Sequence, residues 1–172
     1  MNNLKKLLSV HFLCLFFAAA LNGATAERLE FKKKDQWNVQ GKTEFGDDIF
    51  RNSGKTRMIS KEILPVNPAM VWQLRGSVRS TDGSGRIRLG FLPLDAAQKT
   101  FRDSTGKELI LWCTPEIRGT KRWKDICGGI SAVENPDFVH VKWIKNVKFA
   151  RLVLESSGKI DIVEFGLEKL EE

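Results

Sequence analysis

The chain has 172 residues, a formal net charge of +7, 42% hydrophobic residues and three cysteines. This length allows one domain with its own core and excludes two domains of comfortable size. The basic surplus favours acidic partners such as sulfated or uronic polysaccharides, lipopolysaccharide or anionic membrane surfaces, although an ordinary solvated surface carries a similar surplus.

The first 26 residues have the pattern of a cleaved secretory signal peptide. Two lysines precede an apolar run from Leu7 to Leu21, and Ala24-Thr25-Ala26 offers the small residues that a signal peptidase requires. The run is shorter than the roughly 20 residues that span a bilayer, which favours cleavage over a retained anchor. We therefore expect a mature domain over residues 27–172, periplasmic or secreted, with no membrane span after cleavage and no nucleic-acid partner.

Beyond this segment, apolar residues recur at every second position, and no stretch sustains the stripe of an amphipathic helix. The clearest strand is 70–79, in which Trp72, Leu74 and Val78 share one face. A turn cluster follows, and alternation resumes over 86–91, so we expect these two strands to form an antiparallel hairpin. Further strands are expected over residues 29–33, 36–39, 57–63, 108–112, 138–143, 149–155 and 159–168.

Eight or nine short strands over this length predict an all-β fold, a two-sheet β-sandwich of jelly-roll type. A short helix over 96–101 is the one helical segment that the pattern leaves open. No internal repeat or linker marks a second domain.

Three stretches of the sequence resemble bacterial carbohydrate-binding modules of the galactose-binding-like jelly-roll type. Residues 65–74 resemble the entry to the central strand, 89–95 the strand that ends in an Asp before a small loop, and 149–165 the two closing strands. Leu94 departs from the family pattern, in which an aromatic residue commonly precedes the Asp, and the usual glycine after Asp95 is missing. The resemblance implies the jelly-roll fold and makes glycan the leading ligand class, although jelly rolls host many unrelated functions.

Four arginines support a binding hypothesis. On the expected hairpin, Arg75 and Arg79 share a face of one strand, Arg86 and Arg88 share a face of the next, and the turn would bring all four side chains together. Like charges on neighbouring strands are destabilising unless something compensates them. An acidic glycan could balance these charges, because the planar guanidinium group of arginine pairs with carboxylate or sulfate. Carboxylates of the protein, supplied by other strands, could balance them instead.

Two of the five tryptophans are the best placed for ligand contact. Trp112 and Trp123 flank a polar, basic segment, whereas Trp72 and Trp143 fall on the inward phases of their strands. Sugar rings stack their C–H faces on flat aromatic surfaces. We therefore predict glycan contacts at Trp112 and Trp123, with core packing as the alternative fate of both.

Cys113 and Cys127 are the cysteines that remain after the predicted cleavage. In an oxidising compartment two such residues can pair, and we expect a disulfide between them, with two reduced thiols as the alternative.

No cofactor is required by any pattern in the chain, but the family resemblance implies a structural calcium. Such an ion is held in that family by oxygens from the first and last strands, and Glu30 and Asp161 resemble those positions. Calcium takes six to eight oxygen ligands, and no Asp-rich loop supplies them here.

Catalytic motifs are absent from the sequence. Gly54-Lys55-Thr56 ends like a phosphate-binding loop, but Ile49 occupies the position of the first glycine, and no Gly-x-Ser-x-Gly elbow occurs. The sequence therefore predicts an exported, non-catalytic carbohydrate-binding domain with acidic glycans favoured. An envelope protein–protein interaction domain is the alternative. A small glycan hydrolase or lyase remains a third reading, because a carboxylate pair can form between distant strands.

Overall fold

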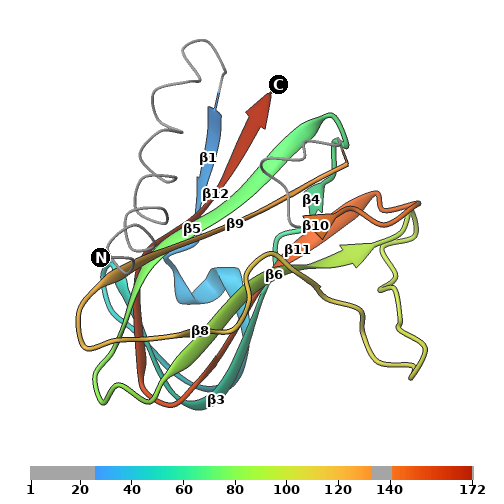
Figure 1. Ribbon diagram of the computed structural model, residues 1–172. Helices are drawn as coiled ribbons and strands as arrows, with labels where there is room; N and C mark the ends of the chain where they lie inside the picture. Colours follow the sequence, from blue (N-terminus) through green and yellow to red (C-terminus); the bar gives the residue numbers. More distant parts are fainter. Residues whose placement is uncertain (1–25, 133–140, 172) are drawn as a thin grey trace, which may run out of the picture.

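The computed structural model describes residues 26–132 and 141–171 (Figure 1). The predicted signal peptide lies outside these residues except for Ala26. The described residues form twelve strands and one short 3-10 helix, so the all-β prediction is confirmed. No helix among them is long and apolar enough to cross a bilayer. Residues 96–101 form a turn in place of a helix, because the Asp95 carboxylate accepts hydrogen bonds from the backbone N–H groups of Ala97 and Lys99.

The strands vary widely in length. They are β1 (Ala26–Glu30), β2 (Trp37–Phe45), β3 (Ile49–Ser60), β4 (Leu64–Pro65), β5 (Met70–Ser80), β6 (Arg86–Leu94), β7 (Leu111–Trp112), β8 (Ile117–Arg118), β9 (Lys124–Ser131), β10 (Val141–Lys142), β11 (Phe149–Ser157) and β12 (Ile160–Glu171), with the 3-10 helix η1 (Lys34–Gln36) before β2.

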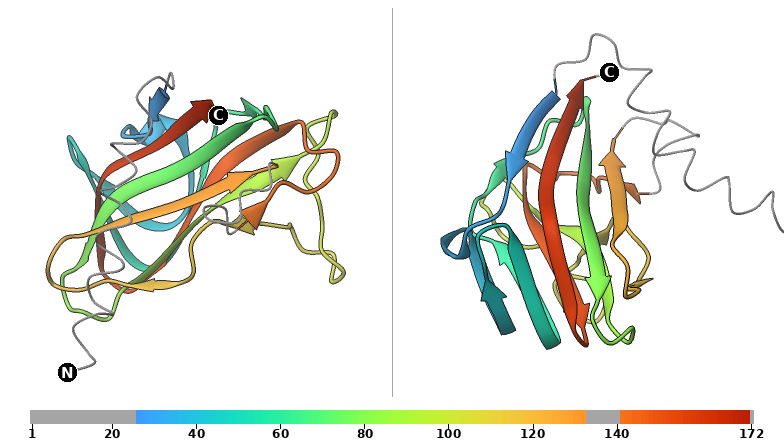
Figure 2. Two further views of the ribbon diagram at one scale, coloured as in Figure 1. Left: turned by 45° about the horizontal axis from the view of Figure 1, so that its top comes forward. Right: turned by 90° about the vertical axis from the view of Figure 1, so that its left-hand side faces the viewer.

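The strands are arranged in two layers, which Figure 2 shows from two sides. The β5 layer contains β10, β9, β5 and β12, with β1 beside β12, and the β6 layer contains β3, β11 and β6, with the short β7 and β8 beside β6. The predicted sandwich is present, but its hydrogen-bonded ladder is continuous. Residues 49–52 of β3 pair with β12, whereas residues 56–59 of the same strand pair with β11. One strand therefore joins the two layers.

The main core fills the space between these layers. Trp72 and Leu74 from β5 face Leu89 and Phe91 from β6, and all four side chains are fully buried. The Trp72 and Phe91 rings meet edge to face at 5.6 Å between centroids, and Trp143 packs against both. The inward positions predicted for Trp72 and Trp143 are thus confirmed.

The expected hairpin of residues 70–79 with 86–91 is wrong. β5 pairs with β9 and β12, whereas β6 pairs with β11, β7 and β8. The turn between them carries the chain from one layer to the other. Gly85 is buried in this crossing, where a Cβ would lie 2.6 Å from the Ile160 side chain. Alternation fixes which side chains share a face, but the same pattern suits any neighbouring strand.

Several strand segments have no counterpart among the predicted strands, and the longest are β9 and the first part of β3. In β9, Gly128 lies so close to the preceding segment that a Cβ would be 2.4 Å from the Cys113 carbonyl oxygen, which explains a glycine inside a strand. The first part of β3 is polar. Its buried Asn52 donates to the Ser156 hydroxyl at 2.9 Å and accepts from the Thr43 hydroxyl at 2.8 Å, so cross-strand hydrogen bonds replace apolar alternation.

Candidate functional site

The outer face of the β6 layer contains a groove of about 780 Å³. A second hollow of about 450 Å³ adjoins it and shares the side chains of Arg57 and Arg88. Four cationic and two acidic residues line the larger groove together with hydroxyl and amide groups. These side chains point outward because they alternate with buried ones, as Arg88 does between Ile87 and Leu89.

A row of three charged side chains crosses the floor of this groove. Glu155 of β11 is paired in register with Arg57 of β3 on one side and with Arg88 of β6 on the other. One Glu155 oxygen accepts from Arg57 Nε at 2.6 Å, and the second accepts from Arg88 Nη2 at 2.6 Å and Nε at 3.1 Å. A single carboxylate thus bridges two guanidinium groups, and Arg57 has a second carboxylate partner in Glu108, 3.7 Å from its Nη1. We call Arg57, Glu155 and Arg88 the charged row.

The carboxyl of Glu155 is held in its ionised form. Burial favours the neutral acid and by itself would raise the pKa of Glu155, but the hydrogen bonds from Arg88 and Arg57 outweigh it and set the pKa below its ordinary value. Glu155 is therefore a hydrogen-bond acceptor at neutral pH and not a proton donor.

Trp112 extends the charged row toward β7. The guanidinium carbon of Arg88 lies 3.7 Å from the centroid of the Trp112 ring, which is a close cation–π contact. Trp112 is half-buried and packs against a small apolar cluster on the same face, formed by Leu92, Leu94 and Val153. Arg88 and Trp112 thus form one stacked unit, in which Arg88 lines the groove and both side chains line the adjoining hollow.

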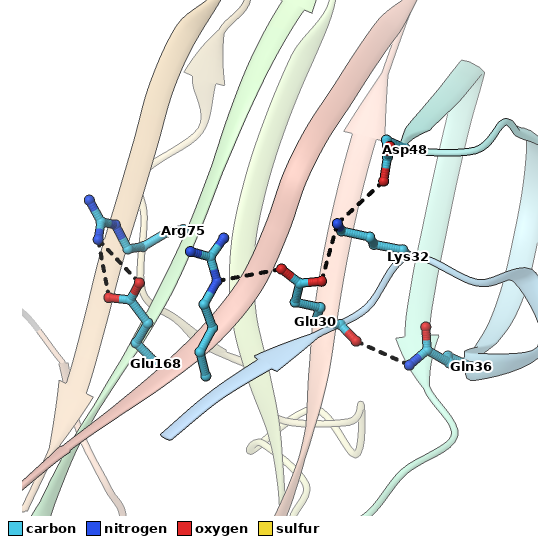
Figure 3. A network of polar contacts seen from close by, with 7 residues as sticks. Glu30, Lys32, Gln36, Asp48, Arg75 and Glu168 are labelled. Atoms are coloured by element: carbon cyan, nitrogen blue, oxygen red, sulfur yellow. Dashed lines mark hydrogen bonds and ion pairs between the residues drawn. The ribbon is translucent and has the colours of Figure 1, made fainter. Parts of the chain in front are cut away.

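The other predicted site residues lie on the β5 layer. Arg79 of β5 forms an ion pair with Asp161 of β12 at 2.8 Å, and its guanidinium carbon lies 4.7 Å from the centroid of the Trp123 ring. Trp123 is 43% exposed, the one exposed large hydrophobic side chain of the described residues. Arg75 donates to both carboxylate oxygens of Glu168 on the same face (Figure 3).

The four arginines and two tryptophans do not form one site. Arg86, Arg88 and Trp112 lie at the groove, whereas Arg75, Arg79 and Trp123 belong to the opposite layer. Each arginine also has a carboxylate partner from another segment. Carboxylates of the protein, the alternative to an acidic glycan, thus balance the arginine charges. The pairs are Arg75 with Glu168, Arg79 with Asp161, Arg86 with Glu116 and Arg88 with Glu155. Ligand binding by these residues stays a prediction.

Glu30 and Asp161 each contact a cationic side chain in this arrangement. Asp161 is bound by Arg79, and Glu30 is bound by Lys32 at 3.1 Å (Figure 3). Glu30 is opposite Gly166 of β12, not opposite Asp161. The described part of the chain contains no group of three or more His, Cys, Asp or Glu side chains that could hold a metal. Calcium binding remains a prediction from the family resemblance alone.

Cys113 and Cys127 are reduced thiols in this structure and form no disulfide with each other. The Cys113 side chain is buried in the core, and this burial raises the pKa of its thiol far above the ordinary value. Cys127 alternates with the buried Ile126 and Gly128 of β9, so its side chain leaves on the outer face of the layer. The strand alternation thus directs the two thiols differently.

Sequence reasoning overlooked two members of the charged row, Arg57 and Glu155. Both were placed on predicted strands, but nothing in the sequence indicates that those strands are neighbours. The sequence gives only a weak signal that these two residues belong to a site. Each is a charged residue between two positions that are buried in the structure, as Glu155 is between Leu154 and Ser156.

No protein-family model matches the sequence, and no curated protein matches it. Solved structures do. The CBM22-1 xylan-binding domain of Paenibacillus barcinonensis Xyn10C is 14% identical, with a TM-score of 0.53 over 87% of this chain and 96% of that domain. The CBM22-1–CBM22-2 tandem of the same protein is also 14% identical, with a TM-score of 0.54 over 87% of this chain and 46% of the tandem.

A family 11 carbohydrate-binding module of a Clostridium thermocellum cellulosomal cellulase is more distant, at 11% identity and a TM-score of 0.46 over 86% of each chain. At these identities the likeness concerns the fold. The first two structures confirm that this chain has the jelly-roll fold found in carbohydrate-binding modules, as its sequence resemblance implied.

Proposed function

We propose that this chain is a non-catalytic carbohydrate-binding domain that holds a glycan in the groove of the β6 layer. One observation carries the proposal: the charged row and the stacked Trp112 line adjoining hollows on one outer face of the sandwich. The shared fold with a xylan-binding domain supports it. Jelly rolls have many functions, so the argument depends on this groove and not on the fold alone.

The groove offers groups that suit sugar hydroxyls. Arg57 and Arg88 have donors that point into the groove and are held in place by Glu155, so little side-chain freedom is lost when a ligand binds. The hydroxyl of Ser157 and the amide of Gln40 add further donors and acceptors along the walls. Trp112 is half-buried in the adjoining hollow and supplies apolar contact area there, while Arg88 covers one face of its ring.

The charge of the groove favours acidic glycans within this proposal. Its four cations outnumber its two carboxylates, and both carboxylates are already bound by arginine. Lys55 forms no ion pair with any described residue and is exposed, so it is the cation most available to a uronic acid or a sulfate.

Binding without catalysis agrees with the state of the groove acids. Glycoside hydrolysis uses two carboxyl groups, one of which must carry a proton at working pH. Arginine contacts set the pKa of Glu155 below its ordinary value, and Glu116 is held by Arg86 at 2.7 Å. These are poor conditions for a general acid.

A glycan array followed by calorimetry with neutral and acidic polysaccharides tests the proposal. We expect binding that weakens at high salt, because exposed charges are screened beyond about 10 Å at 0.1 M salt. Arg88→Ala should lower the affinity about tenfold or more, since it removes donors that line the groove. Trp123→Ala, on the other face, should leave it unchanged. Absence of binding to every glycan, or equal affinity of the Arg88→Ala variant, would contradict the proposal.

The proposed export depends on the signal sequence in residues 1–26. N-terminal sequencing of protein isolated from cells tests it directly. A chain that begins near Glu27 is the expected result, and an intact leader would contradict export by this route.

A further inference from the structure

The connection from β8 to β9 carries an exposed patch of positive charge. Residues 118–124, which we call the basic loop, contain four cations and no acid. Lys121, Arg122 and Lys124 are exposed, and within the described ranges none of them forms an ion pair. The arginines of the charged row, by contrast, have carboxylate partners. The basic loop therefore places three exposed cations without a described ion-pair partner within four residues of one another.

A tryptophan lies among these cations. Trp123 is the exposed aromatic side chain described above, and the guanidinium of Arg79 supports one face of its ring. Arg79 is itself held by Asp161, so the ring is fixed at the surface instead of being folded into the core. A single exposed aromatic side chain is ordinary by itself, but here it lies in sequence among three exposed cations, and an anionic surface with an apolar layer beneath it would engage both kinds of group.

The basic loop is held in one conformation by backbone hydrogen bonds. The N–H of Gly119 donates to the Gly85 carbonyl at 2.9 Å, and the N–H of Ser80 donates to the Thr120 carbonyl at 2.7 Å. The Thr120 hydroxyl donates to the Arg122 carbonyl at 2.8 Å. Gly119 is buried, and a Cβ there would lie 2.9 Å from Ile160 and Ser80 side-chain atoms. The cations are thus presented on a fixed base, which lowers the entropy lost on binding.

The loop lies at the end of the sandwich where the chain passes from the β6 layer to the β5 layer (Figure 1). None of its residues lines the groove or the adjoining hollow. A projecting loop of this kind suits a broad, flat surface better than an inserted polymer. Indole rings prefer the headgroup level of a bilayer, and lysine and arginine are attracted to anionic lipids.

We propose that the basic loop binds the surface of membranes rich in anionic phospholipids, with Trp123 at the headgroup level. The loop and the glycan groove are separate surfaces. Membrane attachment would hold the domain at the lipid surface while the groove on the β6 layer stays accessible. This inference does not depend on the proposed carbohydrate binding.

Sedimentation of the whole domain with vesicles tests the proposal. We expect binding to vesicles of phosphatidylglycerol mixed with phosphatidylcholine, none to phosphatidylcholine alone, and loss of binding at high salt. Each cation near the surface strengthens binding about fivefold, so the triple variant K121E/R122E/K124E should bind at least a hundredfold more weakly. Tryptophan emission should shift to the blue on binding, and W123F should abolish this shift because the other four tryptophans are buried or half-buried.

A matched control separates the loop from net charge. The triple variant K33E/K34E/K61E makes the same change of charge at exposed positions on other segments, and we expect it to lose less than tenfold. Equal losses in the two triple variants, or no binding to anionic vesicles, would overturn the proposal. Binding of soluble acidic polysaccharide that is lost in K121E/R122E/K124E but kept in Arg88→Ala would assign the loop to a polysaccharide and would also overturn it. Arg88→Ala should keep full vesicle binding, so the two proposals can fail separately.

Discussion

The two outer faces of the sandwich carry similar charged residues but balance them differently. On the β5 layer Arg75 contacts Glu168 and Arg79 contacts Asp161, each carboxylate binding one of these arginines. On the β6 layer Glu155 bridges Arg57 and Arg88 inside a groove, and Arg57 also lies 3.7 Å from Glu108. The groove as a whole has four cations for two lining carboxylates, so donors and positive charge remain for a ligand. The comparison teaches that residue type does not identify a binding face, but the arrangement of the partners around a hollow does.

The largest expected effect is on the free energy of unfolding, at the close contact between Gly128 of β9 and the Cys113 carbonyl. Gly128→Ala places a Cβ 2.4 Å from the carbonyl oxygen of Cys113, where the chain leaves the β6 layer. We expect a loss of about 3 kcal/mol in the free energy of unfolding, at the upper end for overpacking. Chemical denaturation measures it. Gly129→Ala is the matched control, because its Cβ would meet only Trp72 O at 3.5 Å, and it should change stability by less than about 0.5 kcal/mol.

A smaller effect tests the shared carboxylate of the charged row. Glu155→Gln removes the carboxylate that Arg57 and Arg88 share and leaves Arg88 without its ion-pair partner, while Arg57 keeps only the longer contact with Glu108. We expect a loss of about 2 kcal/mol at neutral pH. Glu116→Gln removes an exposed carboxylate from the same groove and should cost less than about 0.5 kcal/mol. Equal effects of the two substitutions would show that the charged row is no stronger than a surface ion pair.

The pH dependence of the same variant sharpens this prediction. The pKa of Glu155 is lowered in the folded protein, so its stabilisation is present above the unfolded value of about 4.3 and is lost as the pH falls through the folded pKa. The difference in unfolding free energy between wild type and Glu155→Gln should therefore be largest above that pH and shrink in acid. A constant difference across the acid range would contradict the assigned ionisation.

The smallest effect is expected on the opposite face. A double-mutant cycle with Arg75→Ala and Glu168→Ala should give a coupling energy below about 0.5 kcal/mol, because Arg75 is half exposed and solvent screens the pair. The same cycle on Arg88 and Glu155 should give a larger value. If the two cycles agree, the proposed difference between the faces is not energetic.

Part of the candidate site was predictable from the sequence. Alternation correctly placed Trp72 in the core and Arg86 and Arg88 on an outer face. The same pattern led to the wrong hairpin, because a period of two does not reveal which strand lies beside which. Glu155 was overlooked for this reason: its role depends on having Arg57 and Arg88 on its two neighbouring strands.

For the basic loop too, the sequence shows the residues but not their partners. Its cations and Trp123 are visible in the sequence, but the four arginines of the binding hypothesis looked equally free to bind an anionic ligand. Only the structure shows that those arginines have acidic partners while the lysines beside Trp123 have none among the described residues.

The sequence by itself determined the all-β class, the jelly-roll resemblance and the faces of the main strands, because these follow from local alternation and turn residues. The tertiary structure decided the strand order, the unbonded cysteines, the position of the groove and the partner of every charge. These features depend on contacts between residues far apart in the chain, such as Arg57 with Glu155 and Gly128 with Cys113. No local pattern encodes such contacts, since many strand orders bury the same apolar faces.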